Sequence, residues 1–195
     1  METLAFYCRW EQWPEKADAA LESILPPERR KRMTAMPQHK RREVLAAYGL
    51  LRRGVQRLLG MEQIPVLSYG ASGKPCFLDI SAVQFNLSHT EQCALCVFSH
   101  RPVGADVEKI RPVSRERALR LQLPEDPDAF FAEWAARESR IKLRGESALH
   151  CRAPVAAKPG EHLTMLPLHP AFAAAVCAYT TDPIQVEEME PAALL

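Results

Sequence analysis

The fold is decided by residues 85–108, which read FNLSHTEQCALCVFSHRPVGADVE. Apolar and β-branched residues dominate this stretch and predict buried strands. The two densest runs, at residues 93–99 and 103–108, predict a β-hairpin whose second strand begins after Pro102. A strand pair of this composition belongs to the interior of a sheet, so the rest of the chain should pack around it.

The second run carries two acidic residues, Asp106 and Glu108, among apolar neighbours. Because side chains alternate between the faces of a strand, these two point to one face, while Ala105 and Val107 point to the other, toward a core. Two adjacent carboxylates repel each other unless a cation lies between them, and hard divalent cations prefer oxygen ligands. The alternative is an exposed acidic strand end.

Length and composition set the outer limits. The 195 residues suffice for one domain or for two small halves packed together. With 25 basic and 24 acidic residues, the net charge gives no reason to expect a nucleic-acid partner. The first residues lack a signal-peptide pattern, and no apolar run approaches membrane-spanning length. We therefore expect a soluble, cytoplasmic protein with no membrane partner.

The six cysteines show neither the spacing of a disulfide framework nor that of a complete zinc site. Cys93 and Cys96 are three positions apart, and on a strand this odd offset places them on opposite faces. We predict buried, reduced thiols.

Hydrophobic periodicity predicts the remaining elements. Strands are expected at residues 4–8, 64–69, 77–78 and 85–87, and helices at 14–25, 28–36, 39–59, 115–121 and 129–144. Ser114 and Asp128 are expected N-caps of the last two helices, and Gly60 and Gly145 are expected C-caps. Ten Lys or Arg residues lie between Glu28 and Arg57. Most of them would form a solvated face, and one or two could reach a phosphate.

The helix at 129–144 contains a carboxylate on its apolar stripe. Glu138 is flanked there by Trp134 and Ile141, so it should be buried. An exposed salt bridge between Glu138 and Lys142, four residues on, is the simple alternative. A buried carboxylate needs a partner, and a metal shared with the acidic pair of the strand would supply one.

Two further segments suggest anion binding. Lys74 lies between Gly73 and Pro75, where a stiff backbone could present its ammonium to an anion, although such a triplet is often only a turn. Ser88 and His89 follow at the end of the next strand. Together these residues favour a corner that binds an oxyanion.

The first hairpin has an echo near the C-terminus. Residues 94–99 align with 175–180, and Pro102 then falls on Pro183 without a gap. This suggests two related halves, each with a hairpin whose second strand follows a proline. The alternative is that any two buried hairpins look somewhat alike.

Four motifs in a fixed order now identify a resemblance. They are Gly-Lys-Pro at 73–75, Phe-Asn-Leu-Ser-His at 85–89, Val-Gly-Ala-Asp-Val-Glu at 103–108, and Trp-Ala-Ala-Arg-Glu-Ser-Arg-Ile-Lys at 134–142. Together they resemble the 4'-phosphopantetheinyl transferase superfamily, in the type that activates peptide synthetases such as the surfactin enzyme. The resemblance implies an α/β (α+β) fold. It consists of a pseudo-twofold pair of similar halves, 1–101 and 102–195, each with a small antiparallel sheet packed on helices and with a ligand cleft between them.

The resemblance also implies the residues of the site. Asp106, Glu108 and Glu138 look like ligands of Mg²⁺, and Glu138 and Lys142 like the catalytic residues, with Lys142 at the pyrophosphate. The implied contacts to coenzyme A are Gly73, Lys74, Pro75, Asn86, Ser88, His89, Asp106 and Lys142, together with Arg42 or Arg52 from the long helix.

The implied reaction transfers the 4'-phosphopantetheine arm of coenzyme A to a serine of an apo acyl or peptidyl carrier protein and releases 3',5'-ADP. Either Glu138 or a metal-bound water would take the serine proton. Acidic carriers could dock on the basic residues of 29–57, and an internal duplication would make a monomer sufficient. The alternatives are a metal-dependent nuclease or phosphohydrolase and a non-catalytic coenzyme-A-binding module.

The chain departs from the family pattern in three places. Arg137 stands where the family most often has lysine, and Ala105 replaces a larger aliphatic residue. The segments 109–130 and 146–170 look short, which leaves the carrier preference open.

Overall fold

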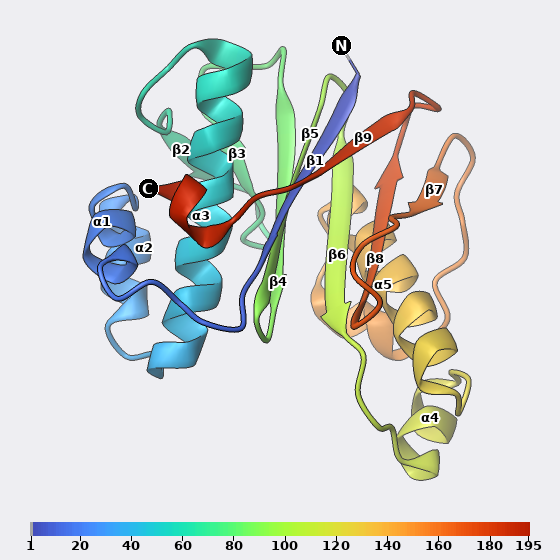
Figure 1. Cartoon of the computed structure of the whole chain (residues 1–195). Coiled ribbons are helices and arrows are strands. Elements are labelled where there is room, and N and C mark those ends of the chain that lie inside the picture. The colour runs from blue at the N-terminus through green and yellow to red at the C-terminus, as the bar shows by residue number, and fades with distance from the viewer. Residues whose placement is uncertain (1) are drawn as a thin grey trace.

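The computed structural model describes residues 2–195, apart from the side chain of Ala148. Two sheets pack face to face, and one long helix covers the outer face of each (Figure 1). The first sheet has the order β4 (Gln84–Thr90), β5 (Cys93–Ser99), β1 (Thr3–Arg9) and β9 (Ile184–Glu188). The second has the order β6 (Val103–Lys109), β8 (Phe172–Ala178) and β7 (His162–Met165).

The long helices are α3 (Gln38–Leu59) on the first sheet and α5 (Pro127–Arg144) on the second. Shorter elements complete the fold: α1 (Ala17–Ser23), α2 (Pro27–Met33), α4 (Arg115–Leu121), the paired strands β2 (Leu67–Tyr69) and β3 (Pro75–Phe77), and the 3₁₀ helices η1 (Ala148–Arg152) and η2 (Pro191–Leu194). Within the described residues, no helix combines the length and apolar composition needed to cross a membrane.

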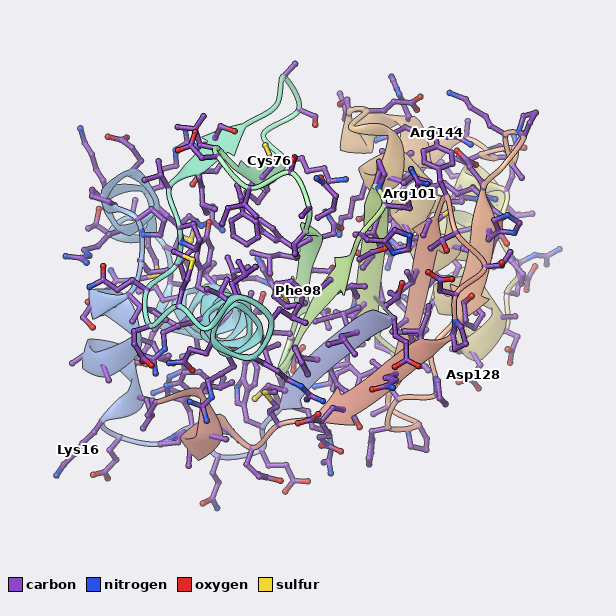
Figure 2. All side chains as sticks on the ribbon, turned by 90° about the horizontal axis from the view of Figure 1, so that it is seen from above. Lys16, Cys76, Phe98, Arg101, Asp128 and Arg144 are labelled. Carbon is purple, nitrogen blue, oxygen red and sulfur yellow. The ribbon has the colours of Figure 1, made fainter. Side chains whose placement is uncertain are left out.

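Two glycines let the long helices approach their sheets. A Cβ atom at Gly54 of α3 would lie 2.0 Å from the ring of Phe98, which Figure 2 shows between α3 and the strands. A Cβ atom at Gly104 of β6 would lie 2.1 Å from the carbonyl oxygen of Ser139 in α5. The glycine of Val-Gly-Ala-Asp-Val-Glu therefore brings α5 into contact with the strand that carries the acidic pair.

The space between the sheets holds an apolar core. Ala105 and Val107 pack there against Val97 and Val176, as predicted for the apolar face of this strand. Cys93 belongs to this core, whereas Cys96 lies in the core under α3. Both thiols are buried and free, which confirms the prediction of reduced cysteines on opposite faces.

The hairpin predicted for residues 93–108 is wrong. β5 pairs antiparallel with β4 on one edge and with β1 on the other, so no edge remains for β6. β6 instead pairs with β8 in the second sheet. The C-terminal hairpin fails in the same way, because β8 lies between β6 and β7 and β9 pairs parallel with β1. Each proline of the echo marks a crossing between sheets.

Other boundaries agree with the sequence to within a few residues. Ser114 caps α4 as predicted, and Gly60 and Gly145 adopt left-handed conformations at the ends of α3 and α5. The N-cap of α5 is Asp126 rather than Asp128, because Pro127 takes the first helical position and Asp126 accepts a hydrogen bond from the Ala129 amide.

Candidate active site

Four of the predicted site residues meet where β4, β6 and α5 come together. Asp106 is 2% exposed, and its Oδ1 accepts hydrogen bonds from Ser88 Oγ at 2.7 Å and from Lys142 Nζ at 2.6 Å. Lys142 Nζ also lies 3.0 Å from Ser88 Oγ and 3.6 Å from Glu138 Oε2. The salt bridge between Glu138 and Lys142 on α5 is therefore half-buried rather than exposed. Asp106 of β6 also takes part in it.

Glu108 and Glu138 share an unusual electrostatic environment. Burial and the nearby charge of Asp106 raise the pKa of each carboxyl group to about 7. Burial disfavours the charged form of Lys142, but Asp106 and Glu138 outweigh this, so the pKa of its ammonium is raised. Arg111 Nη1 also lies 3.7 Å from Glu108 Oε2, so two cationic groups face the three carboxylates. When all three are ionised, the carboxylates carry one negative charge more than Lys142 and Arg111 balance.

Two observations bear on whether a divalent cation fits here. Oδ2 of Asp106 is buried without a hydrogen-bond partner, and the raised pKa values of Glu108 and Glu138 show that added positive charge would be favourable. In the part of the chain that the structure describes, no three His, Cys, Asp or Glu side chains have the geometry of a formed metal site. The ammonium of Lys142 lies among the carboxylates instead. The donor set suits magnesium, which prefers carboxylate oxygens.

The raised pKa values predict how stability depends on pH. Glu108 and Glu138 bind protons more tightly in the folded protein, at about 7, than at their ordinary value of 4.5. The free energy of unfolding of the metal-free protein should therefore fall as the pH rises through this window, and level off above it. Urea unfolding in EDTA at a series of pH values measures this, and Glu138→Gln should reduce the slope. A flat or rising profile would contradict it.

The ammonium group of Lys74 is engaged in hydrogen bonds within the protein. Its Nζ donates to the carbonyl oxygens of Val103 at 2.8 Å and of Lys142 at 2.7 Å, so it links the loop before β3 to β6 and α5. Burial lowers the pKa of Lys74 to about 8. Gly73, with a φ of +80°, and Pro75 lie on either side of it. All three line a cavity that also reaches Glu138 and Lys142.

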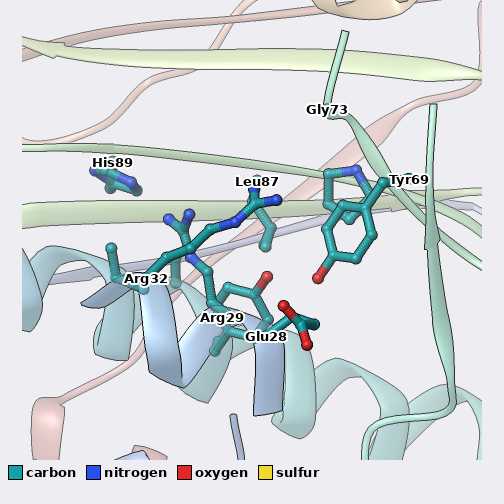
Figure 3. A pocket seen from close by; sticks show the side chains of 11 residues that line it. Glu28, Arg29, Arg32, Tyr69, Gly73, Leu87 and His89 are labelled. Atoms are coloured by element: carbon teal, nitrogen blue, oxygen red, sulfur yellow. The ribbon is translucent and has the colours of Figure 1, made fainter. Parts of the chain in front are cut away.

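A second cavity lies on the other side of β4, toward α2 and α3. Its lining includes His89, Gly73, Pro75, Leu87, Tyr48, Tyr69, Glu28, Arg29 and Arg32. Figure 3 shows Arg29 and Arg32 extending from α2 toward the strand that carries Leu87 and His89. The imidazole of His89 is oriented by Glu43 of α3, with 3.1 Å between Nδ1 and Oε2. The two cavities share Gly73, Pro75 and Leu87 and so form one continuous lining.

The arginines named from the long helix lie elsewhere. Arg42 faces Asp18, at 3.9 Å, and Arg52 donates to the carbonyl oxygen of Leu195. Neither lines the cavity of His89, where Arg29 and Arg32 supply the guanidinium groups. The sequence contained a signal for these two residues, because they are three positions apart in a basic helix and share one of its faces.

Comparison with known proteins finds relatives that share one name. Chain segments match 4'-phosphopantetheinyl transferase Sfp of Bacillus subtilis (35% identity over 86 residues, 38% of this chain and 38% of the relative) and HetI of Nostoc (34% over 129 residues, 56% and 54%). The 4'-phosphopantetheinyl transferase psf-1 of Bacillus pumilus is 30% identical over 159 residues, which cover 68% of this chain and 67% of the relative.

The chain belongs to the 4'-phosphopantetheinyl transferase family. The match to psf-1 extends over two thirds of both proteins, although for Sfp and HetI it spans only about half of the relative's length or less. No model of a known protein family matches the chain. Membership in this family suggests which reaction to test for the cluster of Ser88, Asp106, Glu138 and Lys142.

Proposed function

We propose that this protein transfers the 4'-phosphopantetheine arm of coenzyme A to a serine of an apo acyl or peptidyl carrier protein. The observation that carries the proposal is the cluster of three acidic residues and Lys142, adjacent to a cavity lined by Arg29, Arg32 and His89. The acidic cluster with Lys142 suits a pyrophosphate with a cation. The cavity of Arg29, Arg32 and His89 suits the phosphate-bearing nucleotide end of coenzyme A.

The proposed fold relationship supports a single site between two halves. The strand order β4-β5-β1 of the first sheet recurs as β7-β8-β6 in the second, and one long helix covers each. We infer a pseudo-twofold duplication with halves 1–101 and 102–195, in which only the first crossing strand carries the acidic pair. Because one chain with an internal duplication supplies both halves of the site, a second copy of the chain is not needed, and we propose a monomer.

Each residue of the cluster has a role in this reaction. Asp106, Glu108 and Glu138 would hold Mg²⁺, which when bound neutralises charge on the pyrophosphate. Lys142, held by Asp106 and Ser88, stabilises the leaving phosphate. The serine oxygen forms a bond to phosphorus as the bond to 3',5'-ADP breaks. The serine proton passes to Glu138, the carboxylate that lies 3.6 Å from Lys142.

One incubation tests the proposal. The protein is mixed with magnesium, coenzyme A and a panel of apo-carrier proteins, and the products are read by intact mass. We expect one carrier or more to gain a phosphopantetheine arm and an equal amount of 3',5'-ADP to appear. Cleavage of coenzyme A with water as acceptor would indicate a phosphohydrolase, and binding of coenzyme A without turnover would indicate a non-catalytic module.

Arg29→Ala should weaken binding of coenzyme A. The guanidinium lines the cavity of His89, and loss of one charge-assisted phosphate contact costs about 1.5–3 kcal/mol, so KM for coenzyme A should rise roughly tenfold to a hundredfold with little change in kcat. Steady-state kinetics measure both constants. Lys31→Ala removes an exposed charge from the same helix and should change neither. Equal effects of the two variants would show that only general charge matters.

A further inference from the structure

β6 has an edge that no strand covers. β8 pairs with one side of β6, and the other side faces β4, which belongs to the first sheet. The amide groups of Ala105, Val107 and Lys109 point to this uncovered side. A buried N–H group without a partner costs about 1–3 kcal/mol, so this edge needs acceptors.

Side chains of β4 supply these acceptors. Asn86 Oδ1 accepts from the Ala105 amide at 2.8 Å, Ser88 Oγ accepts from the Val107 amide at 3.3 Å, and Thr90 Oγ1 accepts from the Lys109 amide at 3.3 Å. All three side chains are buried, with exposed fractions of 3%, 5% and 8%.

These three contacts form a regular ladder. Every rung joins residues 19 positions apart, so the two strands run in the same direction in a single register. Alternate residues of a strand face one side, which lets every second side chain of β4 meet every second amide of β6. A shift of one residue would turn each side chain of β6 to the opposite face.

The middle rung belongs to the active site, because Ser88 also donates to Asp106 and contacts Lys142. We propose that the outer rungs, Asn86 and Thr90, are positioning residues that hold β6 so that Asp106 and Glu108 form a cation site with Glu138. This inference rests on the proposed function for its catalytic meaning. It assigns to Asn86 a contact with the strand, where the family resemblance implied a contact with coenzyme A.

Thr90 offers the cleanest test. Thr90→Val keeps the β-branched shape and removes the acceptor, whereas Thr90→Ser keeps the acceptor. Thr164→Val on the exposed strand β7 controls for the same chemical change outside the ladder. Mn²⁺ is the probe because it accepts the same oxygen ligands as Mg²⁺ and its free form is counted by electron paramagnetic resonance.

We expect Thr90→Val to weaken Mn²⁺ binding by about tenfold, the lower end of what loss of a contact that orients metal ligands costs, and Thr90→Ser and Thr164→Val to change it less than twofold. Amide exchange at Lys109 should accelerate in Thr90→Val alone. Coenzyme A affinity without metal should stay within twofold. Asn86→Leu should also weaken Mn²⁺ binding, with a larger effect. If this variant fails to fold, the comparison of Thr90→Val with Thr90→Ser still tests the proposal.

Several results would overturn the inference. If Lys109 exchanges faster in Thr90→Val but Mn²⁺ affinity is unchanged, the rung is structural only. Equal losses in Thr90→Val and Thr90→Ser would exclude the acceptor as the cause, and no Mn²⁺ binding by the unaltered protein would remove the cation site. If the unaltered protein binds Mn²⁺ and transfers no arm, the proposed function fails, and the inference is still judged on Mn²⁺ affinity.

Discussion

Glu138→Gln is expected to lower the rate of arm transfer by about a thousandfold, while coenzyme A affinity changes less than threefold. The substitution keeps the size of the side chain but removes a carboxylate that contacts Lys142 at 3.6 Å and whose pKa is about 7. Loss of a general base alone costs about a hundredfold to ten-thousandfold, and loss of a metal ligand adds to this. The cavity lined by Arg29 and Arg32, where we propose that the nucleotide binds, does not include Glu138, so coenzyme A binding there should persist.

Single-turnover transfer to an apo carrier measures the rate, and equilibrium titration with coenzyme A measures the affinity. Glu133→Gln is the matched control, because Glu133 lies on the same helix with its side chain 46% exposed, and its salt bridge is to Arg137, outside the cluster. It should transfer at nearly the unaltered rate. If Glu138→Gln loses affinity and rate in equal proportion, Glu138 serves binding and has no catalytic role.

The sequence predicted the composition of the acidic cluster well. Alternation along 103–108 placed Asp106 and Glu108 on one face and the apolar residues in the core, and both assignments agree with the structure. The position of Glu138 on the apolar stripe of its helix predicted burial, and its side chain is partly buried, with 19% exposed. These inferences depend on periodicity within one element, which the local sequence determines.

The failures concern relations between elements. Nothing in residues 93–108 shows that β5 already has a neighbour on each edge, because those neighbours come from 84–90 and from the N-terminus. The resemblance named Arg42 and Arg52 from the long helix, whereas the guanidinium groups that line the cavity of His89 come from Arg29 and Arg32 of α2. Lys74 was expected to face an anion, and in the structure it donates to the carbonyl groups of Val103 in β6 and Lys142 in α5. Such choices depend on packing between distant segments.

Asp106→Asn is expected to have the largest effect of any single substitution in the cluster. Asp106 is the carboxylate that the other groups share, since its Oδ1 binds both Ser88 and Lys142 and its charge raises the pKa values of Glu108 and Glu138. An amide keeps the shape and removes the charge. Transfer should fall by about ten-thousandfold, because Lys142, the proposed cation and the proposed base, Glu138, all lose their common partner.

The variant also allows a test that does not depend on activity. Removing the charge of Asp106 should lower the pKa of both Glu108 and Glu138 toward the ordinary value of 4.5, because repulsion from Asp106 is a cause of each shift. Carbon-13 NMR titration of the glutamate carboxyl groups in metal-free protein measures this directly. Asp182→Asn, at an exposed aspartate near His100, should leave both values unchanged. Values that stay near 7 in Asp106→Asn would mean that burial alone raises them. The carboxylates would then not act as one electrostatic unit, and the main reason to place a cation among them would be lost.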